Sequence, residues 1–267
     1  MNGWRGYLGL GVLAYSIFLV ATVPAARAYP LLKSSIAPLA LYGLDGTLWS
    51  GRADTADLGA YRLGSLSWQA HPWKMLLGRL EFAWTAAKDS AQGSGVAARG
   101  LTGKFHLSAT RARVPVAELS AQLPFLPLQP GGVLRIELSK MQIDDNIIVA
   151  ADGILAWENA AFVTPQPVNL GSLALTLVTD DSGIKGVLLD KGGALQAQGV
   201  LMLKPDGSYQ FTGTLASRDP QQPQIQQSLA ILGKPLPDGK IAVSWSGLLP
   251  GAKPAVAKQT TQTQKVL

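Results

Sequence analysis

The chain has no cysteine among its 267 residues, and this absence removes several kinds of chemistry at once. Without thiols there is no disulfide framework, no thiolate nucleophile and no zinc site with cysteine ligands. Histidine is nearly absent too, with 2 residues. No Walker A sequence, G-x-S-x-G elbow or H-E-x-x-H pair occurs. These absences argue against an enzyme and favour a protein that functions through its architecture.

Charged residues are also few, at 15% of the chain, whereas hydrophobic residues make up 47%. An ordinary soluble domain carries roughly 25% charged residues. The deficit indicates either little water-facing surface or a membrane segment. The net charge of +6 is scattered along the chain, without a basic cluster interleaved with aromatics, so nucleic-acid binding is not predicted. A weak attraction to anionic lipid fits the same charge.

The longest uncharged stretch lies at the N-terminus, from Gly6 to Ala26. As a helix it would span roughly 32 Å, enough for a bilayer core of about 30 Å. We therefore expect a transmembrane signal-anchor at 6–28, a cytoplasmic N-terminus at 1–5 and a periplasmic β-rich domain at 29–250. The alternative is a cleaved signal peptide, because residues 26–28 form an A-x-A-like site. Both interpretations place the domain outside the cytoplasm, in the periplasm of a Gram-negative cell.

Beyond the N-terminal segment, apolar and polar residues alternate with a period of two. The alternating stretches are 65–70, 80–85, 105–109, 134–138, 173–177, 200–203, 211–215 and 241–245. This period is typical of strands with one buried face. Short turn sequences separate them, such as 180–183 and 205–208. The pattern predicts a mainly β protein with a large, curved antiparallel sheet of about a dozen strands.

Some segments break this alternation. Residues 86–98 are small and polar and predict a loop, and 116–119 predict a short helix. Residues 219–233 predict a second helix, since Asp219 suits the N-cap and Pro220 the first turn. The last residues, 251–267, have no period and predict a disordered tail.

One sequence block occurs twice. Asp-Gly-x-Leu followed by Trp, and then Leu-Gly-Ser-Leu, occurs within 43–72 and again within 151–180. The two glycines are 18 residues apart in both copies. We interpret the copies as an internal duplication of strand pairs, with Trp49 and Trp157 in matching packing positions.

The residues that could form a catalytic or metal site show little of the spacing that such sites need. His71 and His106 show no metal-ligand spacing, and surface positions are favoured for both. The acid pairs Asp144-Asp145 and Asp180-Asp181 begin turn sequences, which explains them better than calcium or acid–base chemistry. The glycine-rich stretch 93–98 lacks the strand and helix of a dinucleotide site. We therefore predict no catalytic, cofactor-binding or metal-binding residue.

Tryptophans are frequent in the strand-like stretches. They are Trp49, Trp68, Trp84, Trp157 and Trp245. Packing within the sheet is the favoured role, because each buries a large area. The alternative is that they line a groove for acyl chains or for a partner.

Taken together, several ordered elements resemble a known family. They are 43–53, 63–68 with Pro72 and 76–78, 153–160, 190–193 with Gly199, 204–209 with Gly213 and Arg218, and finally Leu229, 232–233 and 238–240. This set resembles protein N of the bacterial type II secretion system, from the N-terminal segment to about Leu249. The resemblance implies a bitopic inner-membrane protein, accessory to a machine that moves folded proteins from the periplasm across the outer membrane. Its implied partners are the inner-membrane platform and the periplasmic parts of the apparatus, and no enzymatic activity or cofactor is implied.

The sheet leaves one question open. A large sheet with one apolar face needs a cover, and the sequence offers few helices for it. Either the sheet folds over on itself and serves as a scaffold for partners, or it curls into a trough. An apolar trough would suit a periplasmic carrier or binder of lipid, which is the alternative function.

Overall fold

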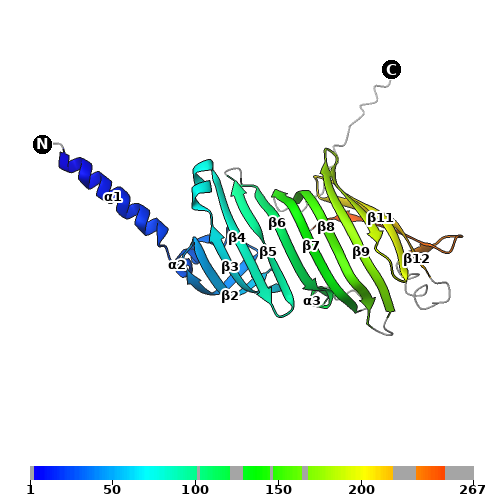
Figure 1. The fold of residues 1–267 in the computed structure, drawn as a ribbon. Coiled ribbons are helices and arrows are strands. Elements are labelled where there is room, and N and C mark those ends of the chain that lie inside the picture. The colour runs from blue at the N-terminus through cyan, green and yellow to red at the C-terminus, as the bar shows by residue number, and fades with distance from the viewer. Residues whose placement is uncertain are drawn as a thin grey trace, which may run out of the picture.

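A computed structural model describes residues 3–100, 103–120, 129–144, 147–163, 168–218 and 233–249. Two helices at the N-terminus lead into one large antiparallel sheet (Figure 1). The strands are β1 (Leu39–Gly46), β2 (Ser50–Leu58), β3 (Tyr61–Ala70), β4 (Arg79–Lys88), β5 (Ala91–Gly100), β6 (Phe105–Pro115), β7 (Pro130–Asp144), β8 (Ile147–Phe162), β9 (Val168–Asp180), β10 (Gly183–Asp190), β11 (Leu195–Leu203), β12 (Ser208–Ser217), β13 (Lys234–Pro235) and β14 (Ile241–Leu248). The mainly β prediction is confirmed.

The 14 strands follow one another across the sheet almost in sequence order, and only β13 and β14 are exchanged at the end. Every neighbouring pair is antiparallel, from β1–β2 through β12–β14. Strands β1 and β13 are the two ends of the order, so the sheet is open. The folded-over and trough-like shapes expected from the sequence both stay predictions, because the order of the strands does not distinguish them.

The two faces of the sheet differ as the alternation predicts. One row of cross-strand neighbours runs Ile136, Leu155, Leu175 and Leu188 across β7 to β10, and we call this side the apolar face. On the opposite side, the polar face, one row consists of Ser67, Thr85, Ser94, Arg111 and Glu137. Burial of the apolar rows is the main favourable contribution to such a fold.

The N-terminal segment forms two helices, α1 (Gly3–Ala21) and α2 (Ala25–Leu32). The helix breaks before Pro24, whose backbone is extended at φ −63° and ψ 135° and which has no N–H to donate. Ala25 and Ala28 of α2 are buried, and this helix packs on β1. No helix in the described part of the chain combines the length and apolar character needed to cross a membrane. The predicted anchor at 6–28 is thus not found as one continuous span.

The predicted loop at 86–98 is wrong. These residues form the end of β4, a tight turn and most of β5, which pair from Lys88↔Ala91 to Arg79↔Gly100. The small residues suit a strand here because β4 places Trp84 opposite Gly95. The alternation of apolar and polar residues is absent from β5 because the large side chain that fills this space, Trp84, belongs to the neighbouring strand β4.

The short helix predicted at 116–119 is confirmed as α3 (Val116–Ser120). A six-residue 3₁₀ helix, η1 (Pro72–Leu77), connects β3 to β4. The predicted helix at 219–233 falls almost wholly outside the described residues, and the predicted tail at 251–267 falls wholly outside them.

The two copies of the repeated block share one feature and differ in another. Gly64 and Gly171 both have positive φ, pair with fully buried alanines (Ala56 and Ala160), and lie at bulges where the register shifts. The Asp-Gly-x-Leu parts do not correspond, because Gly46 ends β1 whereas Gly153 lies inside β8. The first copy thus covers parts of three strands and the second parts of two. The duplication itself stays a prediction.

Candidate interaction surfaces

The two histidines do not meet. His71 follows β3, with its Nδ1 3.7 Å from Glu81 Oε1, a carboxylate that also pairs with Lys74. His106 lies in β6, next to Ala98 of β5. Over the described ranges, no three histidine, aspartate or glutamate side chains gather closely enough to hold a metal ion.

Aspartates of the turn sequences hold the hairpins closed. Asp180 Oδ1 accepts hydrogen bonds from the Ser182 amide at 2.8 Å and the Ser182 hydroxyl at 2.6 Å, between β9 and β10. Asp206 makes the same two bonds to Ser208 between β11 and β12. These bonds, led by the serine hydroxyls, lower the pKa of both carboxyls. The turn interpretation of Asp180 is confirmed, and Asp145 lies outside the described residues.

A further aspartate, Asp190 in the 190–193 stretch, ties β10 to the end of β12. Asp190 Oδ1 is 2.6 Å from Arg218 Nη2 and also accepts the Gly192 amide, while Oδ2 accepts the Ala197 amide. Arg218 also donates to the Gly193 carbonyl. Burial raises the pKa of Asp190, but the bonds from Arg218 and the two amides outweigh it and leave the pKa lowered. This clamp is structural, and only its turn sequence is visible in the chain.

Charges on the polar face are paired across strands. Glu158 of β8 lies 3.0 Å from Arg113 and 3.0 Å from Arg135, and Arg135 lies 3.4 Å from Glu137. The arginines are half exposed, so each pair adds only about 0–1 kcal/mol. The arrangement is typical of a solvent-exposed surface on which charged side chains pair with one another.

The tryptophans divide into two groups. Three indoles donate to backbone carbonyls: Trp49 to Val20 at 2.7 Å, Trp68 to Leu48 at 3.0 Å and Trp157 to Gly131 at 2.8 Å. Trp49 and Trp157 therefore lie in different surroundings, since one secures the end of α1 and the other the start of β7.

Trp245 belongs to β14 and is 49% exposed, stacked on Phe211 at 5.3 Å between ring centroids. The packing role is thus supported for the three bonded tryptophans, whereas Trp245 presents much of its ring to the outside.

Besides Trp245, a group of exposed apolar side chains lies on the polar face of β8 to β11. We call it the outer apolar patch, and it consists of Ile154, Val178, Val187, Leu189 and Val200, which are 37% to 55% exposed. Ile154, Val187 and Val200 lie in one cross-strand row, with Thr176 between the first two. Apolar side chains gathered in this way, beside polar neighbours, are typical of protein contact surfaces.

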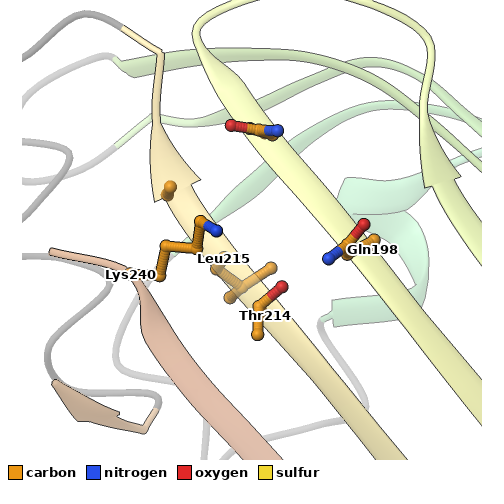
Figure 2. Close-up of a pocket in the computed structure, with 6 residues that line it drawn as sticks. Gln198, Thr214, Leu215 and Lys240 are labelled. Atoms are coloured by element: carbon orange, nitrogen blue, oxygen red, sulfur yellow. The ribbon is translucent and has the colours of Figure 1, made fainter. Parts of the chain in front are cut away.

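A small hollow lies beside this patch, at the ends of β11 and β12. Figure 2 shows Gln198 on one strand, Thr214 and Leu215 on the next, and Lys240 alongside. The volume it encloses is about 10 Å³, room for about one water molecule and far below the roughly 300–1,000 Å³ of ligand pockets. A hollow of this size is too small for an acyl chain.

The fold and these surfaces define a mainly β scaffold whose distinctive groups lie on the faces of one large sheet. A family model described as type II secretion system (T2SS), protein N, matches residues 37–244, and the chain belongs to this family.

Its relatives carry the same description. The type II secretion system protein N of Vibrio cholerae is 30% identical over 244 residues, covering 87% of this chain and 94% of that protein. The protein of that name from Aeromonas hydrophila is 28% identical over 246 residues, covering 89% and 96%. The one from Pectobacterium carotovorum is 25% identical over 249 residues, covering 89% and 94%. No solved structure matches the chain.

Proposed function

We propose that the protein is an accessory, non-catalytic component of the type II secretion system. It assists the export of folded proteins from the periplasm across the outer membrane, through contacts with the inner-membrane platform and the periplasmic parts of the apparatus. The observation that carries this proposal is the family match over 37–244, which runs from just before β1 into β14 and so includes the sheet almost entirely.

Attachment to the inner membrane, with the sheet in the periplasm, is supported by α1. This helix leads away from the sheet (Figure 1), and its large apolar side chains are exposed, for example Leu10 at 65% and Phe18 at 62%. A helix that is apolar on all sides is stable when lipid or protein surrounds it. Trp49 holds the end of α1 to the β1–β2 turn, so the sheet would be carried close to the membrane.

Action through protein contacts is supported by the surfaces. Charges on the polar face pair with one another, and the outer apolar patch offers a contact area. The lipid-carrier alternative has less support, because apolar-face side chains such as Leu155, Leu175 and Phe211 are already partly buried among their neighbours.

The proposed function is tested by deleting the gene and measuring secreted proteins in the medium and the periplasm. We expect exoproteins to accumulate in the periplasm and the full chain to restore their release. A chain without residues 3–21, directed to the periplasm by a cleavable signal, should restore it poorly. Unchanged secretion after deletion would contradict the proposal.

A further inference from the structure

The most exposed large hydrophobic side chain among the described residues is that of Leu31, at 82%. It belongs to α2, the helix between α1 and the sheet, whose Ala25 and Ala28 are buried where the helix packs on β1. Arg27 precedes Leu31 by four residues, so the two side chains share one side of α2, and Arg27 is exposed too. The helix is therefore fixed to the sheet on one side and presents an arginine and a leucine on the other.

An exposed tryptophan lies close by, in η1. Trp73 is 59% exposed, and the ammonium of Lys74 lies 5.3 Å from the centroid of its ring. Trp49 connects η1 to α1, because its indole donates to the Val20 carbonyl and its own carbonyl accepts the Ala70 amide at 2.6 Å. Trp73 follows Ala70 by three residues, a distance of at most about 11 Å. This exposed indole is thus near the end of α1.

The segment after α2 is held at the same corner of the sheet. Arg99 of β5 donates from Nη1 to the Ser35 carbonyl at 3.2 Å, and Arg99 pairs with Leu80 across the β4–β5 ladder. Lys33 precedes Ser35 by two residues, Arg79 is the neighbour of Leu80, and both cations are exposed. They therefore lie in the neighbourhood of α2 and η1, at the end of the sheet from which α1 leads away (Figure 1).

We call these exposed side chains the junction surface; they are Arg27, Leu31, Lys33, Trp73 and Arg79. None of its three cations takes part in an ion pair between described residues. The carboxylate of Glu81, two residues from Arg79, is only 12% exposed and pairs with Lys74 instead. The junction surface thus combines positive charge that no carboxylate compensates with two exposed apolar side chains.

We propose that the junction surface rests on anionic phospholipid headgroups, at the point where α1 leaves the bilayer. Leucine and tryptophan side chains partition into the interfacial layer of a membrane, and lysine and arginine side chains pair with lipid phosphates. The inference rests on the proposed function and deepens it, because α1 must first be held in the inner membrane.

The position of α2 relative to α1 favours lipid over a protein partner. Helix α2 begins four residues after α1 ends, and its 8 residues span about 12 Å. The Leu48 amide donates to the Val23 carbonyl at 2.9 Å, so the link between the two helices is fixed to the β1–β2 turn. A membrane-embedded α1 would therefore bring the outward side of α2 to the membrane surface before any partner binds.

The absence of cysteine allows a single label at a chosen position of the full chain, inserted in phospholipid vesicles. Leu31→Cys and Trp73→Cys would each carry a fluorophore whose emission shifts to the blue in apolar surroundings. We expect both labels to emit further to the blue in vesicles of phosphatidylcholine with phosphatidylglycerol than in phosphatidylcholine alone.

Leu189→Cys is the matched control for these labels. Leu189 is 49% exposed but lies in β10, seven positions from β3 in the sheet, or roughly 33 Å along it. Its label should show the emission of a water-exposed group in both kinds of vesicle. Water-like emission from both junction labels, or an equal shift at Leu189, would overturn the proposal.

A charge exchange tests the contact with the headgroups separately. Lys33→Glu with Arg79→Glu, in the chain labelled at position 31, should return the emission in anionic vesicles to that in phosphatidylcholine. Lys185→Glu with Lys191→Glu, in β10 and just after it, changes the net charge equally and should keep the blue emission. An equal loss in both double variants, or no loss in either, would overturn the role of the junction cations.

Flotation of the chain with the vesicles reports membrane attachment itself. A chain that floats with neither lipid would contradict the proposed attachment, and the contact of the junction surface with it. A chain that floats while its junction labels stay in water would contradict only the contact of the junction surface. None of these measurements uses secretion, so the role in export keeps its own test.

Discussion

The indole of Trp84 lies against Gly95, the residue directly opposite it in the β4–β5 pair. A Cβ on Gly95 would lie 3.1 Å from Trp84 Cζ2 and 2.7 Å from Thr110 Oγ1. Gly51 faces Trp68 in the same way, where an added Cβ would lie 2.6 Å from the ring. A large indole on one strand is thus accommodated by a glycine at the opposite position of the neighbouring strand.

Gly95→Ala should destabilise the fold by about 1–3 kcal/mol, because the new methyl group meets both an indole and a backbone neighbour. Chemical denaturation monitored by tryptophan fluorescence would measure the loss. Gly93→Ala is the matched control on the same strand, since its Cβ would lie 3.3 Å from the Trp84 ring and 3.4 Å from Ala112. Equal losses in the two variants would contradict this account of the packing.

Trp49→Phe should loosen the junction between α1 and the sheet. The substitution keeps an aromatic ring but removes the indole bond to the Val20 carbonyl. Loss of about 1 kcal/mol would raise the equilibrium constant for local opening roughly fivefold. Hydrogen exchange of peptides covering 18–26 measures this, with Trp73→Phe, at a residue 59% exposed, as the control. Unchanged exchange in the Trp49 variant would argue against the indole as the tether.

Asp190→Asn should lower the free energy of unfolding by about 1 kcal/mol near pH 7. This value takes into account that solvent screens the half-exposed Arg218 partner. The folded state lowers the pKa of Asp190, so its contribution is present above the ordinary aspartate value of about 3.9 and is lost as pH falls through the folded value. The stability difference from wild type should therefore shrink below about pH 4. Denaturation curves from pH 3 to 7 measure it.

The exposed Asp45–Arg52 pair serves as the control for this titration. Both of its side chains are about 70% exposed, so Asp45→Asn should change stability little at any of these pH values. A difference for Asp190→Asn that does not depend on pH would show that the charge of Asp190 does not stabilise the clamp.

Glu118→Gln should lower the pKa of Tyr61. Burial raises this pKa first, and the negative charge of Glu118 raises it further. Glu118 also bonds Lys88 at 2.9 Å and raises the pKa of that ammonium. Removing the charge leaves burial as the main remaining cause, so Tyr61 should titrate at lower pH than in the wild type. NMR of ring-labelled tyrosine measures the shift, with Glu137→Gln on the polar face as the comparison.

Much of the sheet could be predicted from its own strands. Stretches such as 80–85 and 173–177 alternate because each strand places one side toward apolar neighbours, and this information is local. Strand β5 was not predicted because its residues are small. They are small because the Trp84 side chain of β4 packs against them, which the sequence of β5 alone does not reveal. The break at Pro24 was visible only as one proline inside an apolar run, and packing of α2 on β1 decided its effect.

The surfaces were harder to predict than the strands. The Asp190–Arg218 clamp joins residues 28 positions apart, and alternation says nothing of such pairs. The outer apolar patch arises only when Ile154, Val187 and Val200 are brought into one row by the register.

The sequential order of the strands determines how the molecule can assemble. From β1 to β12 each strand pairs with the one made just before it. Each new strand pair closes only a short loop, so folding can begin without contacts between distant parts of the chain. A chain emerging N-terminus first can therefore add its strands one at a time, in the order in which they are made.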